Sequence, residues 1–304
     1  MDYKKIVSSQ RLRFAILNAL GFLPDRLMLG IQYYIKMGRK CNFRNPETWT
    51  EKLQLYKMYY RNPLMGTCVD KFEVRRYVES KGLNDNLVPL YGVYENPEEI
   101  DIDALPASFV LKTTNGGGGQ NVILVRDKAS IDIIAIKEQF SVWKKGFKAG
   151  RNSLGREWAY SQISRFRIVA EELLINDRSP ESGIEDFKIL CFSGVPKYII
   201  VDKDRYTNHR RNFYDTGWNR IDVTTDHEQF ETPYPKPTNL TEMLKIATLL
   251  SEDYPFVRVD LYNVDGKIYF GELTFYPWSG YVKFVPQEFD RILGGLFDIS
   301  SFVK

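Results

Sequence analysis

Four consecutive glycines between two short apolar runs constrain the fold of this chain more than any other part of its sequence. The runs 109–111 and 122–124 have the length and composition of strands, so we expect a hairpin with a nearly bare backbone at its tip, Gly116, Gly117, Gly118 and Gly119. Such a loop can approach a ligand closely and close its backbone N–H groups over phosphates, and Lys112 would add a positive charge. A plain flexible hairpin explains the same segment equally well.

The size and composition of the chain favour a globular protein with one large domain or two smaller ones. With 304 residues, 43% of them hydrophobic, it can bury a sizeable core. The three cysteines, Cys41, Cys68 and Cys191, are far apart and odd in number, which argues for a reducing compartment and against a disulfide framework. No apolar run approaches the ~20 residues that a membrane-spanning helix needs.

Positive charge is concentrated near the N-terminus. Residues 1–61 hold 12 Lys/Arg and 4 Asp/Glu, a net charge of +8, while the rest of the chain carries −5. An apolar stripe from Leu12 to Leu23 predicts an amphipathic helix rather than a signal peptide. A basic segment attracts polyanions such as phospholipid, nucleic acid or acidic polysaccharide, although a solvated surface without a partner is equally consistent with it. We expect a cytoplasmic protein, with attachment to the inner membrane surface as an alternative.

Strands and helices mix without regular β-α-β alternation, which predicts an α+β protein. We expect strands near 87–94, 109–114, 120–126, 167–175, 185–192 and 196–202. Helices are expected at 70–82, 130–144 and 241–251 and at the C-terminus. Two segments, 146–165 and 204–236, are predicted to be loops.

The last predicted hairpin places acidic side chains on one face. Strands at 256–262 and 268–275 flank an Asp265-Gly266 turn. If the turn holds an odd number of residues, one face collects the polar side chains of the hairpin, Arg258, Asp260, Glu272 and Thr274. The two carboxylates then lie directly opposite each other, which is destabilising without a cation, and Mg²⁺ suits such a pair. The alternative is a surface hairpin whose charges Lys or Arg neutralises.

The commoner nucleotide-binding signatures are absent from the sequence. It has no Gly-x-x-x-x-Gly-Lys-Ser/Thr and no Gly-x-Gly-x-x-Gly at a strand–helix junction, so a P-loop and a Rossmann site are excluded. A protein kinase is excluded as well, because Arg211 follows His209-Arg210 where the catalytic Asp would stand. A nucleotide site in this chain therefore has to belong to another class.

The order of these features resembles the ATP-grasp superfamily. Asp70-Lys71 at the start of a helix, Lys112 with the glycine loop, a strand at 171–174, and Asp260 with Glu272 follow that order. The resemblance implies two α+β lobes that bind ATP and Mg²⁺. It also implies three sets of contacts: phosphates on Lys71, Lys112 and the glycine loop, adenine on the hinge residues Glu171, Glu172 and Leu174, and one or two Mg²⁺ on Asp260 and Glu272. Thr274 stands where members of the superfamily usually have asparagine. It would act as a shorter oxygen ligand of the metal or would hold a water.

A narrower resemblance is to the TupA-like branch, found among capsule and cell-wall polysaccharide enzymes. The segments that carry it are 45–53, 60–64, Glu157-Trp158, Asp186-Phe187-Lys188 and 272–277. It implies a short helical segment at 1–66 ahead of two lobes at 67–168 and 169–304. It further implies a phosphate contact for Lys188 and an acyl-phosphate contact for Arg258. Trp278 stands where a small residue is expected.

This resemblance implies an ADP-forming carboxylate–amine ligase that works through an acyl phosphate. We hypothesise that the carboxylate belongs to a uronic acid of an anionic polysaccharide and that the amine comes from an amino acid, with no nucleic-acid partner. Sugar contacts are expected from His209, Arg210, Arg211, Tyr214 and Trp218, although packing of these residues on the core explains them equally well. A glycosyltransferase and a nucleotide-regulated binding protein are the alternatives.

Overall fold

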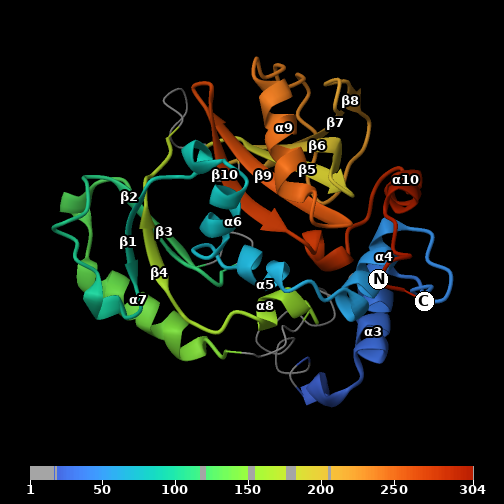
Figure 1. The fold of residues 1–304 in the computed structure, drawn as a ribbon, viewed down its shortest axis with the longest axis horizontal. Coiled ribbons are helices and arrows are strands. Elements are labelled where there is room, and N and C mark those ends of the chain that lie inside the picture. The colour runs from blue at the N-terminus through green and yellow to red at the C-terminus, as the bar shows by residue number, and fades with distance from the viewer. Residues whose placement is uncertain are drawn as a thin grey trace.

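The computed structural model of the 304-residue protein describes residues 17, 19–116, 121–149, 155–175, 183–204 and 207–303. Two antiparallel sheets organise it (Figure 1). The first has the order β1 (Leu90–Tyr94), β4 (Ile168–Glu171), β2 (Phe109–Thr113), β3 (Val122–Val125). The second has the order β10 (Lys267–Thr274), β9 (Phe256–Val264), β5 (Asp186–Phe192), β6 (Val195–Lys203), β7 (Arg210–Asp215), β8 (Arg220–Ile221).

The predicted glycine hairpin forms the edge of the first sheet. β2 pairs with β3 from Phe109 opposite Val125 to Lys112 opposite Val122. The tip residues Gly117, Gly118 and Gly119 lie outside the described part of the chain, so their phosphate contacts stay a prediction. Because side chains alternate along β2, Phe109 and Leu111 pack into a small core with Phe140 of α7 (Ile133–Gly146), while Val110 and Lys112 face the other way.

The first lobe extends slightly beyond its predicted boundary at residue 168. β4, from Ile168 to Glu171, lies in the middle of the first sheet, where it pairs with both β1 and β2. The change from one sheet to the other therefore follows Glu171, and the predicted strand at 167–175 ends there.

The final hairpin pairs Asp260 with Glu272 as predicted, but by a different route. The turn has two residues, Asp265 and Gly266, both with positive φ (50° and 84°), as a tight hairpin turn requires. A β-bulge between Phe270 and Glu272 supplies the odd residue, Gly271. A Cβ at this glycine would lie 3.0 Å from the Asp260 carbonyl oxygen, which explains why glycine is present.

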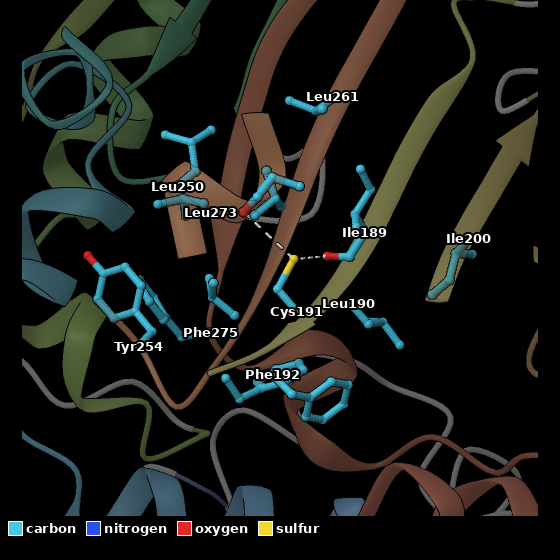
Figure 2. Packing of buried hydrophobic residues seen from close by; sticks show 14 of the residues in the cluster. Ile189, Leu190, Cys191, Phe192, Ile200, Leu250, Tyr254, Leu261, Leu273 and Phe275 are labelled. Carbon is cyan, nitrogen blue, oxygen red and sulfur yellow. Dashed lines mark hydrogen bonds between the residues drawn. The ribbon is translucent and has the colours of Figure 1, made fainter. Parts of the chain in front are cut away.

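One face of the second sheet is covered by α9 (Leu240–Ser251). Alternate residues of β5, including Ile189 and Cys191, join the core between this helix and the sheet (Figure 2). The Cys191 thiol is fully buried, with its sulfur 3.9 Å from the Ala247 carbonyl oxygen, and burial raises its pKa to about 12. All three cysteines are free.

The prediction of a loop over 204–236 is wrong, because β7 and β8 lie within it. β7 pairs with β6 along its whole length, from Lys203 opposite Arg210 to Tyr198 opposite Asp215. We predicted a loop because the residues of β7 are largely polar. In the structure these polar side chains are buried against partners: Arg211 binds Asp202, and Asn212 donates to the Phe230 carbonyl oxygen.

The N-terminal segment packs against the second sheet rather than forming a separate lobe. Its helices are α3 (Asp25–Met37) and α4 (Trp49–Tyr59), and α5 (Leu64–Val69) and α6 (Val74–Ser80) follow them. α4 begins with a capping box between Thr48 and Glu51, and its Trp49, Leu53 and Tyr56 belong to the core of the second sheet. Leu12 and Ile16 of the predicted N-terminal stripe lie outside the described residues.

Shorter elements complete the fold. They are α8 (Trp158–Ser161), α10 (Glu288–Leu296) and the 3-10 helices η1 (Leu20–Phe22), η2 (Asn84–Asn86), η3 (Pro97–Glu99), η4 (Lys128–Ser130) and η5 (Pro277–Gly280). The predicted helix at 70–82 becomes α-helical only at Val74, and Asp70 accepts hydrogen bonds from the backbone N–H groups of Phe72 and Glu73. Among the described helices, none has the length and apolar character required to span a bilayer.

Candidate active site

A cavity of about 350 Å³ lies between the two sheets. Its walls include most of the residues that the sequence singled out. From the turn before α6, the first sheet and the hinge they are Lys71, Lys112, Glu171, Glu172 and Leu174, and from the second sheet and the residue before β7 they are Lys188, His209, Arg211, Arg258, Asp260 and Glu272. Residues far apart in the chain thus meet at one site.

The side of the cavity near the hinge is largely apolar. β2 and β3 contribute Val110, Val122 and Leu124, and Val88 and Leu174 also line this part. The chain leaves β4 here, held by a hydrogen bond from the Glu172 N–H to the Pro89 carbonyl oxygen (3.0 Å). A flat apolar ring fits between such walls.

Lys112 and Lys71 bring positive charge to the same side of the cavity. The Lys112 ammonium lies 2.5 Å from the buried carboxylate of Glu171, which Arg75 approaches at 3.8 Å. Lys71 donates to the carbonyl oxygen of Gly116 at the base of the glycine loop. Burial lowers the pKa of Lys71, and the Glu272 carboxylate opposes this effect.

The second sheet turns a face of buried charges toward the cavity. The strand register places Lys188 opposite Asp260, and Asp202 opposite both Asp186 and Arg211. The Lys188 ammonium donates to Asp186, and it also donates to Asp260 at 3.2 Å and lies 3.8 Å from Asp202. One lysine therefore lies within ion-pair distance of carboxylates on three adjacent strands.

Arg258 supplies the cation that the opposed carboxylates need. Its guanidinium donates two hydrogen bonds of 2.6 Å to Asp260, and others to Glu272 (3.2 Å) and to the Thr274 hydroxyl (3.0 Å). Burial raises the pKa of Asp260 to about 6, against the effects of Arg258 and Lys188. Burial acts in the same direction on Glu272, but the nearby cations outweigh it and lower its pKa to about 2.

The donor set suits a metal ion that arrives with a nucleotide. Among the residues that the structure describes, no group of three His, Cys, Asp or Glu side chains could hold a metal by itself. The available ligands are the opposed carboxylates of Asp260 and Glu272, with the Thr274 hydroxyl 2.9 Å from Glu272. Mg²⁺ commonly takes one or two carboxylates and fills its other positions with water and phosphate oxygens. Asp260 and Glu272 fit that pattern.

The five residues predicted to contact a sugar divide into two groups. His209 and Arg211 line the cavity: the His209 imidazole lies 3.4 Å from Asp202, and Arg211 binds both Asp202 and Asp226 at 2.6 Å. The remaining three, Arg210, Tyr214 and Trp218, do not line this cavity.

Strand alternation explains why Arg210 and Tyr214 do not line the cavity with Arg211. Arg210 and Tyr214 share the face of β7 opposite to that of Arg211. Arg210 pairs with Glu228 at the surface, whereas Tyr214 is buried and stacks on Trp218 with 4.5 Å between ring centroids. Tyr214 and Trp218 are thus part of the packing of the sheet.

Sequence reasoning assigned no role to two acidic residues of the site, Asp186 and Asp202. Both are almost fully buried, and both lie within reach of Lys188. Asp186 precedes Lys188 by two residues in a predicted strand, so alternation alone could have placed the two side chains on one face. Asp202 ends an apolar strand, and only the pairing of β6 with β7 brings it to Arg211.

Comparison with protein families settles which group the chain falls in. Residues 51–298 match the family model described as TupA-like ATPgrasp. The chain belongs to the TupA-like ATP-grasp family. Its two α+β lobes form an ATP-grasp fold, which confirms the predicted fold class and the resemblance. Among curated proteins, none matches the chain.

Several solved structures are similar to this TupA-like protein. D-alanine–D-alanine ligase from Bacillus anthracis shares 20% identity at a TM-score of 0.42, covering 69% of this chain and 57% of that one. N5-carboxyaminoimidazole ribonucleotide synthetase, in complex with ADP, shares 16% at 0.40, covering 70% and 46%. L-amino acid ligase from Bacillus licheniformis shares 18% at 0.40, covering 70% and 42%. The TupA-like chain thus spans about half the length of these structures.

Proposed function

We propose that this protein is an ADP-forming carboxylate–amine ligase. It would join a uronic-acid carboxylate of a capsular or cell-wall polysaccharide to an amino acid through an acyl phosphate. The observation that carries the proposal is the cluster of buried Arg258, Asp260 and Lys188 with the half-exposed Glu272, all four of which line the cavity. Paired carboxylates with adjacent cations can hold a polyphosphate and its metal ion, and the family match supports ATP as the nucleotide.

The two sides of the cavity suit the two ends of ATP. The apolar walls near Leu174 would hold adenine, and Glu171 and Glu172 form the hinge beside it. Lys71, Lys112 and Lys188 would hold the phosphates, with the glycine loop closing over them. Asp260 and Glu272, with Thr274 beside them, would hold Mg²⁺, and the ion would supply positive charge to the phosphate oxygens.

The reaction needs positioning and charge stabilisation more than a protein nucleophile. An oxygen of the substrate carboxylate attacks the γ-phosphorus of ATP, the bond to the β-phosphate oxygen breaks, and ADP leaves. The amine nitrogen then attacks the acyl carbon, loses a proton, and displaces orthophosphate to leave the amide. Arg258 and Lys188 would stabilise the charge that develops on the transferred group.

The far end of the cavity would receive the sugar substrate. Arg211 and His209 lie there, and a guanidinium is a good partner for a uronic-acid carboxylate. The basic N-terminal segment, with its net charge of +8 over residues 1–61, would attract the anionic polymer. We place the protein in the cytoplasm, with attachment to the inner face of the membrane as a further use of this charge.

Product analysis tests the proposal directly. Wild-type protein is incubated with ATP, Mg²⁺, tetragalacturonate and hydroxylamine, which traps an acyl phosphate as a hydroxamate. We expect ADP, orthophosphate and hydroxamate only when the uronic acid is present. AMP with pyrophosphate would contradict the proposal. Release of a nucleoside diphosphate from a nucleotide sugar would favour a glycosyltransferase, and ATP binding without turnover would favour a nucleotide-regulated binding protein.

A further inference from the structure

The loop that follows β10 has a strained backbone. Trp278 and Ser279 have φ values of 49° and 55°, and Gly280 has 68°, so three consecutive residues are left-handed. Glycine adopts this conformation freely, whereas tryptophan and serine rarely do. Strained backbone persists only where the surroundings hold it, and it is common at functional sites. The strand before the loop carries Glu272 and Thr274 of the candidate active site.

Helix α4 holds the loop from one side. The Lys57 ammonium donates to the carbonyl oxygen of Ser279 at 2.7 Å and contacts its hydroxyl at 3.0 Å. Gln54 donates to the carbonyl oxygen of Gly280 at 3.0 Å. These bonds engage the backbone of two of the three left-handed residues, so α4 stabilises this conformation directly.

Lys57 is an unusual residue for that position. Its side chain is 1% exposed, and among the described residues no carboxylate lies within ion-pair distance of it. The Tyr281 ring, 4.6 Å from the ammonium, and neutral oxygens surround it instead. Burial of a charge without an opposite charge is costly, and here it lowers the pKa of Lys57 to about 7. An apolar side chain of similar size would avoid this cost.

The segment before α8 holds the loop from the other side. The Ser279 hydroxyl donates to the Glu157 carboxylate at 2.5 Å. Gly155 lies so close that a Cβ there would be 2.9 Å from the same hydroxyl. Ser279 is therefore bonded both to Lys57 of α4 and to Glu157 of the segment before α8.

Trp278 connects the loop to the cavity. The Arg211 guanidinium, which lines the cavity, lies over the Trp278 ring at 5.1 Å. The ring also packs edge-on against Trp49 and Phe284, each 6.4 Å away. Because the direction of the Trp278 side chain follows from its backbone conformation, a change in the loop would remove the support beneath Arg211.

We propose that Lys57 and Glu157 are positioning residues, which hold the loop 278–280 so that Trp278 supports Arg211 at the acceptor end of the cavity. The contacts of Lys57 and Glu157 with Ser279 support their role in holding the loop whatever the reaction is. That Arg211 lies at the acceptor end of the cavity rests on the proposed function.

Hydrogen–deuterium exchange tests whether Lys57 holds the loop. In Lys57→Met, we expect peptides covering 276–281 to exchange about tenfold faster or more, because the amides of Ser279 and Tyr281 are bonded within the loop. Lys52→Met is the matched control, since Lys52 of the same helix also donates to two backbone carbonyls, those of Gly294 and Phe297. Wild-type exchange of 276–281 in Lys57→Met would overturn the proposal.

Glu157→Gln gives a second test that keeps the side-chain shape. We expect it to accelerate exchange of the same peptides. If Lys57→Met does not fold, this variant decides the matter, and unchanged exchange in it would overturn the proposal as well.

Kinetics separate positioning from general destabilisation. With ATP, tetragalacturonate and hydroxylamine, both variants should raise the KM for tetragalacturonate about tenfold while the Kd for ATP changes less than twofold. Equal losses for both ligands would contradict a role confined to the acceptor end. If wild-type protein shows no turnover, the proposed function fails, and the exchange measurements still decide whether Lys57 holds the loop.

Discussion

The two faces of the six-stranded sheet come from alternate residues of the same strands, yet they differ in almost every physical respect. On β5, Ile189 and Cys191 pack under α9 in an apolar core, while Asp186 and Lys188, which precede them in the strand, line the cavity from the other face. The apolar face is stabilised by burial of surface. The charged face contains ion pairs that are expensive to bury and contribute little to stability, so its composition points to chemistry.

The largest expected effect is on the apolar face. Leu273→Ala should lower the free energy of unfolding by about 2–5 kcal/mol, because it opens a cavity next to Cys191 and α9. Calorimetry or denaturant titration measures this loss. Turnover per folded molecule should stay close to wild type. A large loss of turnover at temperatures where the variant is folded would show that the two faces are not independent.

The preceding residue of β10, Glu272, should behave in the opposite way. Glu272→Gln keeps the side-chain shape but removes the charge, so turnover should fall by about 10² or more while the Tm changes little. Lys112→Ala should have a similar effect from the other sheet. Lys137→Ala, at a half-buried lysine of α7 that does not line the cavity, is the control and should leave turnover unchanged. Wild-type turnover in both Glu272→Gln and Lys112→Ala would show that this face of the sheet is not the active site.

A third expected effect concerns Lys57, the buried cation outside both faces. Its pKa in the folded protein is about 7, well below its ordinary value of 10.5, so the unfolded chain binds this proton more tightly. Stability should therefore rise with pH between about 7 and 8.5, by up to ~1.4 kcal/mol per pH unit. Above that range the cysteines, whose pKa burial raises, act in the opposite direction.

The variant Lys57→Met isolates this contribution. Denaturant titrations at several pH values should show a positive slope in the wild type and a flatter one in the variant. Glu157, Lys36 and Cys41 also act on Lys57 electrostatically, and they are unchanged in both proteins. Identical slopes would mean that Lys57 keeps its proton across this range.

The smallest expected effect is on the basic N-terminal segment. Arg39 is unsuitable for neutralisation because it binds Glu51 and Asp290, and its loss would disturb the packing of α4 on α10. Replacing the exposed Lys40 and Arg44 with Gln should raise the KM for a uronic-acid polymer a few-fold more than for tetragalacturonate, and added salt should reduce the difference. Equal effects on both substrates would leave the segment with a structural role only.

The sequence predicted what depends on local pattern. Strand alternation placed Arg258, Asp260, Glu272 and Thr274 on one face, and the glycine run located the edge hairpin of the first sheet. The pairing of Asp260 with Glu272 depends in addition on the bulge at Gly271, which the pattern did not predict. The family order then brought Lys112 and Leu174 to the same cavity. These predictions succeeded because each depends on neighbours in the chain or on a known order of motifs.

The rest depends on contacts between distant segments. β7 escaped prediction because the partner that buries Arg211 is Asp202 on another strand, and nothing local signals that ion pair. Tyr214 and Trp218 have the composition of a sugar platform, but only the pairing of β7 with β6 shows that Tyr214 faces the core. The cation between the opposed carboxylates is Arg258, and its rotamer could not be derived from spacing.

The bulge at Gly271 has a consequence for the comparison of related sequences. The turn at Asp265-Gly266 places Leu261 opposite Phe270, so deletion of Gly271 would leave a regular ladder in which the glutamate still opposes Asp260. A gap at this position therefore does not signal loss of the carboxylate pair. Deletion of Gly271 would, however, remove backbone that lines the cavity with Tyr262. A substitution at Gly271 should disturb the hairpin more than a deletion does, because a Cβ there would lie 3.0 Å from the Asp260 carbonyl oxygen. At position 271, deletion is thus expected to be tolerated better than substitution.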